Sequence, residues 1–316
     1  MAEFPQLSKD HYPSVYIEDT DELLPRKVDQ NLRYALFKVI ARGGKCLVQS
    51  CKDMNLNRYI CYKSLLPEYQ DDVIEQQRFV REARVTAMLQ HPNTVPTYEL
   101  GRDNRGRYYF TMKLVHGYTF REVLDFRERY DLTQMMDVMI QIAHALEYAH
   151  THGVIHRDIK PENILVGPFG EVLLMDWGLA KVRSRNGENS DLPQGADVIE
   201  ADPTITMHGK LEGTLCYMSP EQIRREPDID ARTDLFSLGA ILYEILTGRT
   251  PVESEDRTTD EVIADTLNKE PEKPSAISAF QVPRRLESIT LQCLKKNAAD
   301  RPASASVLIR MLQQGW

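Results

Sequence analysis

The chain has 316 residues, 42% of them hydrophobic and 27% charged, with a formal net charge of −8. The length fits about two domains, and the composition is ordinary for a soluble globular protein. The negative charge argues against a nucleic-acid-binding protein, because a basic surface supplies most of that affinity, so we expect no nucleic-acid partner.

The first part of the chain divides into a lead-in and a region of mixed strand and helix character. Residues 1–30 carry three prolines and several acidic side chains, which predicts a flexible lead-in. Residues 32–62 and 94–115 have short β-friendly runs, and residues 71–89 between them have helical spacing. The positions expected to form one buried stripe of that helix are Val73, Ile74, Phe79, Ala83 and Met88.

Helical patterns dominate after residue 116. The segments expected to be helical are 132–150, 232–246, 258–268, 285–296 and 303–313. We therefore predict an α+β fold in which a small antiparallel β-sheet domain with one helix, residues 31–113, precedes a larger and mainly helical domain, residues 114–316. A ligand-binding cleft is expected where the two domains join.

Other features bear on compartment and mobility. The five cysteines are odd in number and never spaced as CxxC, which disfavours a disulfide framework and favours a reducing compartment. The most apolar run, residues 235–246, is too short to cross a bilayer, and the N-terminus lacks a signal-peptide pattern. We expect a cytoplasmic location and no membrane segment in this chain. Residues 183–209 have almost no apolar periodicity, which predicts a long loop that is functional, disordered or both.

The octapeptide HRDIKPEN at residues 156–163 carries the most informative chemistry. It supplies a carboxylate at Asp158, a cation at Lys160 and a carboxamide at Asn163. Phosphoryl transfer from a nucleotide needs an acceptor for the hydroxyl proton, a charge near the moving phosphate and a metal-binding oxygen. Beyond this motif, Asp176 places a second carboxylate on a turn, where it suits Mg²⁺.

Together these motifs resemble the catalytic and magnesium loops of the eukaryotic-like (Hanks-type) protein serine/threonine kinases. The sequences at residues 81–84, 89–93 and 176–181 are most similar to those of the bacterial members. The resemblance covers about residues 33–314 and implies the bilobal protein-kinase fold with an activation segment at 176–221. It also implies that Mg²⁺ and ATP are bound, that protein hydroxyls accept the phosphate, and that self-association allows autophosphorylation.

The resemblance assigns roles to individual residues. Asp158 matches the catalytic base, and Lys160 matches the lysine that neutralises charge on the γ-phosphate. Lys63 matches the strand lysine that contacts the other phosphates, and Glu82 matches the helix glutamate that pairs with it. The expected metal ligands are Asn163 and Asp176.

The expected nucleotide-binding surface departs from the family pattern in its glycine-rich loop. That pattern, G-x-G-x-x-G-x-V, falls on residues 41–48 and keeps only the glycine at Gly43. Ala41 and Cys46 stand at the other two glycine positions and should stiffen or lift the loop. The residues implied to contact the nucleotide are Ala41, Gly43, Val48, Cys61, Lys63, Met112 and Leu165.

Further matches concern the helical domain. Glu221 would pair with Arg301 and hold the activation segment, while Asp234 would bind the backbone of the catalytic loop. Thr204 and Thr206 are expected sites of autophosphorylation, because phosphate could pair with Arg157 beside Asp158.

Neither a substitution at Trp177 nor a group of three histidines is expected to change the function. Trp177 stands where the family usually has phenylalanine and can fill the same packing role. The closely spaced His150, His152 and His156 lack the cysteine or carboxylate that would complete a zinc site.

Three functional interpretations remain open. The first is an active protein serine/threonine kinase. The second is a pseudokinase that serves as a nucleotide-binding scaffold, which the altered glycine loop supports and the complete catalytic set opposes. The third is a kinase fold acting on a small molecule. The KPEN motif at residues 160–163 and the segment at 213–221, which resembles the substrate-docking segment of protein kinases, disfavour it.

Overall fold

The structure is a computed structural model that describes residues 20–21, 23–24, 32–127, 130–182, 215–253 and 257–315. The chain divides into two compact units, the first ending at Gly117 and the second beginning at Tyr118. Four residues of a later turn, 167–170, are grouped with the first unit. The sequence placed the junction of the two domains near residues 113–117, next to this division.

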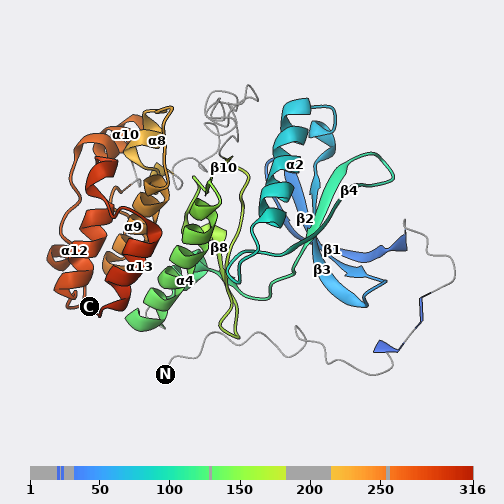
Figure 1. The fold of residues 1–316 in the computed structure, drawn as a ribbon, viewed down its shortest axis with the longest axis horizontal. Coiled ribbons are helices and arrows are strands. Elements are labelled where there is room, and N and C mark those ends of the chain that lie inside the picture. Colours follow the sequence, from blue (N-terminus) through green and yellow to red (C-terminus); the bar gives the residue numbers. More distant parts are fainter. Residues whose placement is uncertain are drawn as a thin grey trace. The chain divides into compact units, whose positions relative to one another are not determined.

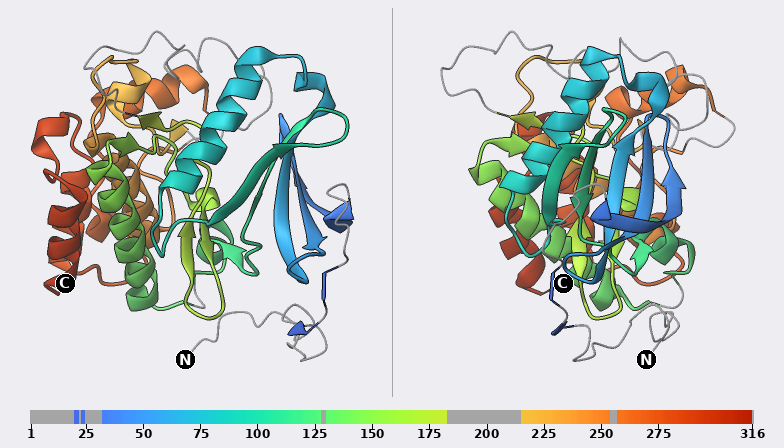
Figure 2. Two further views of the ribbon diagram at one scale, coloured as in Figure 1. Left: turned by 45° about the vertical axis from the view of Figure 1, so that its right-hand side comes forward. Right: turned by 90° about the vertical axis from the view of Figure 1, so that its right-hand side faces the viewer.

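The first unit is a five-stranded antiparallel sheet with one long helix, α2, along one face (Figures 1 and 2). The strand order is β1-β2-β3-β5-β4. The elements are β1 (Tyr34–Arg42), β2 (Cys46–Asp53), β3 (Arg58–Leu65), α2 (Val73–Met88), β4 (Thr97–Arg102) and β5 (Tyr108–Met112). The sheet and the single long helix that the sequence predicted for this part of the chain are confirmed.

The two faces of this sheet differ in what covers them. On one face, Leu65 of β3 and Phe110 of β5 form a core with Phe79 and Ala83 of α2. On the other face, Tyr62 stacks on Tyr109 with their ring centroids 4.6 Å apart. These tyrosines line an open hollow of about 710 Å³. Because side chains alternate along a strand, Lys63 lies on the face opposite to Tyr62, the face that packs against α2.

The buried side of α2 is only partly the predicted one. Phe79 and Ala83 are buried as expected, but the predicted stripe is wrong at Val73, Ile74 and Met88, which are 62%, 48% and 74% exposed. These three residues lie at the helix ends, beyond the part of α2 that packs on the sheet core. Part of the buried side is instead polar, and it includes Glu75, Glu82 and Thr86.

The second unit is mainly helical, with three short strands in one small sheet and two in another (Figure 1). Its longer helices are α4 (Leu132–Thr151), α9 (Arg232–Thr247), α10 (Thr259–Asn268), α12 (Arg284–Cys293) and α13 (Ala305–Gln313). Its short helices are α3 (Phe120–Asp125), α8 (Pro220–Ile223) and α11 (Pro274–Ile277). Its strands are β6 (Tyr118–Thr119), β7 (Val154–Ile155), β8 (Ile164–Val166), β9 (Val172–Leu174) and β10 (Lys181–Val182).

Helix α9 is the centre of the second unit. Every residue of α9 after Arg232 is buried, which confirms the buried helix predicted for the apolar run at 235–246. At Gly239, a Cβ atom would lie 2.5 Å from the Cβ of Cys293 on α12, so only glycine allows these helices to approach so closely here. Helix α12 ends at Cys293, three residues before the predicted end at 296.

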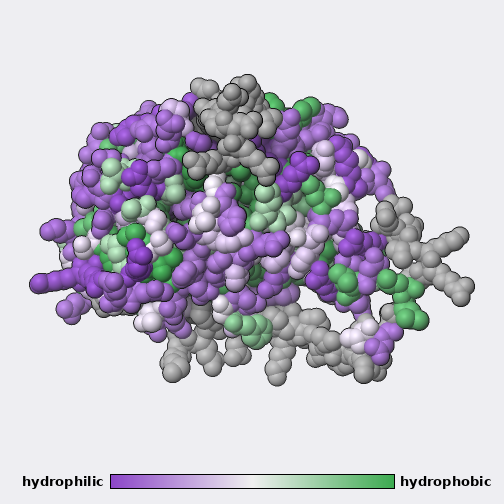
Figure 3. All heavy atoms as spheres, viewed as in Figure 1, coloured by the Kyte–Doolittle hydropathy of each residue, from purple (hydrophilic) through white to green (hydrophobic). Residues whose placement is uncertain are grey.

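Three features of the structure concern its surface, its helices and its cysteines. The face drawn in Figure 3 is largely hydrophilic, with scattered hydrophobic patches. Among the helices in the described ranges, none has the length and apolarity needed to cross a membrane. All five cysteines are free thiols.

Candidate active site

The predicted catalytic residues of the second unit form one hydrogen-bonded cluster. The loop after β7 leads through a short 3₁₀ turn (Pro161–Asn163) into β8. Lys160 Nζ lies 3.1 Å from Asp158 Oδ1 and 3.0 Å from Oδ2. Asn163 Nδ2 donates to the backbone oxygen of Asp158 at 2.8 Å and to its Oδ2 at 3.0 Å. The carboxylate of Asp158 is thereby fixed by a cation and an amide from its own loop.

Asp234, the third residue of α9, accepts hydrogen bonds from the backbone of this loop. Its Oδ2 accepts the N–H of His156 at 2.9 Å, and its Oδ1 accepts the N–H of Arg157 at 2.8 Å. Arg157 needs such support, since its φ of +71° is a strained value for a residue other than glycine. The predicted contact between Asp234 and the catalytic-loop backbone is confirmed.

The electrostatics of the two buried aspartates differ. Burial raises the pKa of Asp158 above its ordinary value, with Lys160 opposing the shift and the charge of Asp176 adding to it. Burial alone would also raise the pKa of Asp234, but the hydrogen bond and charge of His150 lower it. Asp234 is thus kept as an anion, while Asp158 is a stronger proton acceptor than a surface aspartate.

The β8–β9 hairpin brings the two predicted metal ligands to the same end. Ile164 pairs with Leu174, and the N–H of Met175 donates to the oxygen of Asn163 at 2.9 Å, so Asp176 follows directly. Asp176 is exposed and has a φ of +59°. Because Asn163 Nδ2 is engaged with Asp158, its Oδ1 is the atom that can turn toward a metal. An amide and a carboxylate oxygen fit a hard divalent cation.

His156 packs between these two loops. Its Nδ1 accepts the N–H of Asp158 at 3.2 Å, so Nε2 carries the proton and donates to the oxygen of Met175 at 2.9 Å. Its ring centroid lies 4.5 Å from that of the fully buried Trp177. The indole Nε1 of Trp177 has no hydrogen-bond partner within the described part of the chain. Trp177 therefore fills a packing position, as the sequence suggested.

The neighbouring histidines have structural contacts. His150 Nε2 lies 2.7 Å from Asp234 Oδ2, and His152 Nδ1 lies 2.8 Å from the oxygen of Tyr148. Throughout the described ranges, no three His, Cys, Asp or Glu side chains gather into a group that could hold a metal ion.

In the first unit, the predicted ion pair between strand and helix is present. Lys63 Nζ on β3 lies 2.5 Å from Glu82 Oε1 on α2, and both side chains are largely buried. The strand register places several predicted nucleotide contacts on the same face of the sheet as Lys63. Ala41 pairs with Val48, Val48 with Lys63, and Cys61 with Met112.

Two other predicted nucleotide contacts need separate mention. Burial raises the pKa of the Cys61 thiol to about 11, so it stays protonated and packs as a small apolar group. Leu165 lies on β8 of the second unit, opposite Leu173 of β9.

The altered glycine loop is a short turn between β1 and β2. The N–H of Gly43 donates to the oxygen of Cys46 at 2.9 Å. A Cβ atom would meet only this oxygen, 3.6 Å away, at Gly43 and nothing within 4 Å at Gly44, so this conformation does not require glycine. Lys45 of the turn lies 3.1 Å from Glu75 on α2. This ion pair was not predicted from the sequence, because 30 residues separate the two charges.

The anchor after the predicted activation segment is well defined. Ser219 caps α8, and Glu221 receives two hydrogen bonds from Arg301, at 2.6 and 2.8 Å. Both side chains are buried. Burial alone would raise the pKa of Glu221, but the hydrogen bonds and charge of Arg301 lower it. The predicted Glu221–Arg301 pair is confirmed, whereas Thr204 and Thr206 lie outside the described residues.

A second polar network was not predicted. Arg121 of α3 contacts Glu162 of the catalytic loop, Glu244 of α9 and the hydroxyl of Tyr217. Up to 123 positions separate these residues in the sequence, and no local pattern joins them.

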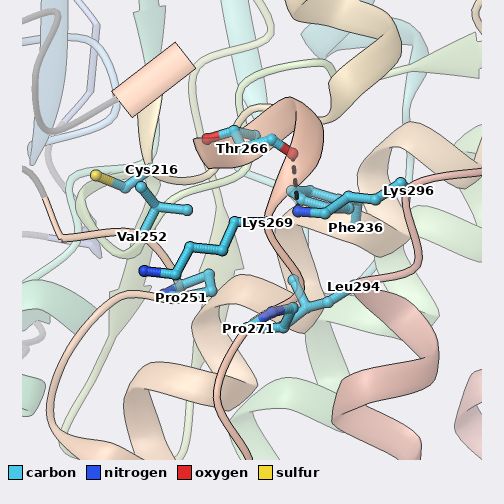
Figure 4. A pocket seen from close by; sticks show the side chains of 9 residues that line it. All are labelled: Cys216, Phe236, Pro251, Val252, Thr266, Lys269, Pro271, Leu294 and Lys296. Carbon is cyan, nitrogen blue, oxygen red and sulfur yellow. Dashed lines mark hydrogen bonds between the residues drawn. The ribbon is translucent and has the colours of Figure 1, made fainter. Parts of the chain in front are cut away.

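A small cavity near the anchor is too small for a ligand. It is drawn in Figure 4 and has a volume of about 10 Å³, room for roughly one water molecule. Lys296 Nζ donates to the oxygen of Thr266 at 2.8 Å in its wall, and Cys216 lines it on another side (Figure 4). We interpret it as a packing gap.

Comparison with known proteins agrees with the geometry. The family described as "Protein kinase domain" matches residues 34–313. The chain is 34% identical to serine/threonine-protein kinase PknD of Protochlamydia amoebophila over 89% of its length and 29% of that protein. It is 35% identical to a probable serine/threonine-protein kinase of Streptomyces coelicolor over 86% of its length and 38% of that protein. Against serine/threonine-protein kinase pkn3 of Myxococcus xanthus it is 32% identical, over 93% of its length and 52% of that protein. The chain thus spans from under a third to about half of these relatives.

Proposed function

The chain belongs to the protein kinase family, and from this premise we propose that it is a serine/threonine kinase that transfers the γ-phosphoryl group of ATP to protein hydroxyls. The observation that carries the proposal is the Asp158–Lys160–Asn163 cluster, held by Asp234 and followed by Asp176 at the same hairpin end. Bacterial serine/threonine-protein kinases among its relatives support the same activity.

Four residues of the second unit would take part in this reaction. Asp158, with its raised pKa, accepts or orients the proton of the attacking hydroxyl. Lys160, now paired with Asp158, supplies positive charge near the transferred phosphoryl group. Asn163 and Asp176 would hold Mg²⁺, which when bound neutralises charge on the phosphates.

The first unit would bind the nucleotide. Lys63, held by its ion pair with Glu82, would contact phosphate oxygens. Ala41, Gly43, Val48, Cys61 and Met112 of the first unit would also contact the nucleotide, and Leu165 of the second unit is proposed as a further contact. The ion pair with Glu82 fixes the position of the Lys63 ammonium, so that little reorganisation of this side chain would be needed to bind a phosphate.

Regulation by autophosphorylation is a second part of the proposal. Phosphate on Thr204 or Thr206 would pair with Arg157, whose backbone is already fixed by Asp234. Transfer between two copies would require transient self-association. The free thiols suit a reducing compartment such as the cytoplasm.

The test is phosphate transfer from Mg²⁺-ATP to the chain itself and to casein, followed by intact mass and phosphosite mapping. Wild type and Asp137→Asn, which changes an exposed aspartate of α4, should both transfer phosphate, and Asp158→Asn should not. Absence of transfer by the wild type to either acceptor would overturn the proposal and favour the pseudokinase interpretation. Nucleotide binding by the same samples would then identify a scaffold.

A further inference from the structure

Gln222 is a buried side chain of α8 whose hydrogen bonds reach the catalytic loop. It is 6% exposed, and its Nε2 donates to the backbone oxygen of Arg157 at 2.7 Å. On the other side of the amide, Oε1 accepts the N–H of Ser219 at 3.1 Å and the hydroxyl of Thr233 on α9, also at 3.1 Å. Both ends of the amide are therefore bonded, and the backbone donor at Ser219 determines which end faces Arg157.

The oxygen that Gln222 binds belongs to the peptide unit directly before Asp158. The N–H of the same unit, that of Asp158, donates to Nδ1 of His156 at 3.2 Å. One side chain thus holds each polar end of the peptide between Arg157 and Asp158. Because a peptide unit is planar, contacts at its two polar ends fix its rotation. They therefore also fix the direction in which the Asp158 side chain leaves the backbone.

The backbone of Arg157 is held from two elements. Asp234 on α9 binds the N–H of Arg157 at 2.8 Å and so fixes the peptide before this residue. Gln222 on α8 binds its oxygen and fixes the peptide after it. Arg157 has a φ of +71°, a conformation that costs energy in a residue other than glycine and persists only where the surroundings hold it. Contacts on both sides of Arg157 supply this support.

We propose that Gln222 is a positioning residue for Asp158. Its hydrogen bond to the oxygen of Arg157 holds the peptide before Asp158 and thereby sets the direction of the carboxylate. The kinetic consequence of this inference rests on the proposed kinase function, whereas the geometric part does not. Gln222 follows Glu221, so the same short helix is anchored to Arg301 and supports the catalytic loop. A displacement of α8 would therefore shift the backbone beside Asp158.

The experiment uses the fact that a carboxyl group can donate a hydrogen bond only when it is protonated. In Gln222→Glu, burial and the facing carbonyl oxygen should raise the pKa of the new carboxyl group. At about pH 8 its anion repels the oxygen of Arg157, and we expect kcat for casein to fall about tenfold, which corresponds to the loss of one hydrogen bond. When the pH is lowered to about 6, the carboxyl group is protonated and can donate, so kcat relative to that of the wild type should rise.

Matched variants separate positioning from stability. Gln222→Met has a similar size but no donor, so its kcat should be reduced at both pH values. Thr247→Val removes a buried hydrogen bond to the oxygen of Tyr243 (2.8 Å) at the C-terminal end of α9, and should lower stability without lowering kcat. Gln281→Glu places the same new charge on an exposed loop and should match the wild type at both pH values. A relative kcat of Gln222→Glu that does not change with pH, or wild-type kcat in Gln222→Met, would overturn the inference.

Hydrogen–deuterium exchange tests the geometry without phosphate transfer. The backbone amides of residues 156–163 should exchange faster in Gln222→Met than in the wild type or in Thr247→Val. Unchanged exchange of this segment in Gln222→Met would overturn the inference, whatever the activity of the wild type. Absence of casein phosphorylation by the wild type, together with faster exchange in Gln222→Met, would overturn the proposed function and support the geometric role of Gln222.

Discussion

The carboxylate of Asp234 accepts the backbone N–H of His156, a residue 78 positions earlier in the chain. The same carboxylate also binds the N–H of Arg157. A side chain on the most buried helix thus determines the backbone path next to Asp158. The geometry of the catalytic loop therefore depends on α9 as well as on the loop's own residues.

Asp234→Asn should impair activity and stability together. The amide keeps the shape of the side chain, but its nitrogen cannot accept one of the two backbone N–H groups. We expect kcat to fall on the order of 100-fold from misplacement of Asp158, and stability to fall by about 1–3 kcal/mol from the unsatisfied buried donor. Steady-state kinetics and urea unfolding measure the two effects. Asp230→Asn, at an exposed pair with Arg232 (2.6 Å), is the control and should change stability by no more than about 1 kcal/mol.

Breaking the Glu221–Arg301 pair should destabilise the second unit. Glu221→Gln leaves the guanidinium of Arg301 buried without its counter-charge, and we expect a loss of about 3–5 kcal/mol. Arg249→Ala removes an exposed pair with Glu253 and should cost less than about 1 kcal/mol. Equal losses in both variants, measured by denaturant unfolding, would contradict the role assigned to the buried pair.

The Glu221–Arg301 pair should also make the stability of the protein depend on pH. The folded-state pKa of Glu221 is lowered from its ordinary value of 4.5, so its contribution to stability is fully present above that value. As the pH falls through the lower folded pKa, the carboxylate is protonated and the contribution is lost. The free energy of unfolding should thus decrease below about pH 4.5, and Glu221→Gln should show a shallower decrease. Parallel pH profiles for the two proteins would contradict this assignment.

Lys63→Met should reduce phosphoryl transfer on the order of 100-fold, because it removes a preorganised charge from the proposed phosphate site. Lys38→Met is the matched control, since Lys38 is an exposed lysine on strand β1. Initial rates over a range of ATP concentrations would separate a binding defect from a slower chemical step. Similar rates for both variants would show that Lys63 is not part of the nucleotide site.

Trp177 allows a test of packing against polarity. Trp177→Phe removes a buried indole N–H that has no partner in the described residues, but it also leaves a small void. These effects oppose each other, so stability should change by less than about 1.5 kcal/mol and activity should remain. Trp177→Ala should cost about 3–5 kcal/mol. Thermal unfolding measures both variants, and a large loss in Trp177→Phe would mean that the N–H has a partner after all.

The sequence predicted best those parts of the site that are local in the chain. The motif HRDIKPEN predicts the cluster of Asp158, Lys160 and Asn163, because these interacting residues lie within eight positions of one another in the sequence. Glu221–Arg301 and the contact of Asp234 with the loop could be predicted only through resemblance to a known family. Arg121 was missed, because its partners are brought together by folding and not by any periodic pattern.

The same limit explains the errors in α2. Hydrophobicity predicted Val73 and Met88 to be buried, but burial depends on where the sheet meets the helix. Glu82 is buried because Lys63 neutralises it, which a hydrophobic pattern cannot show. The lysine–glutamate pair was found only through the family motif.

The left-handed backbone at Arg157 and Asp176 affects any attempt to raise the thermal stability of this protein. Each such conformation costs on the order of 1 kcal/mol or more in a residue other than glycine. Glycine at position 176 would relax the turn but would also remove a proposed metal ligand. A screen that rewards thermal resistance alone would favour this replacement, and a screen for turnover would reject it. At position 176, thermal stability favours glycine, whereas the proposed catalysis favours aspartate.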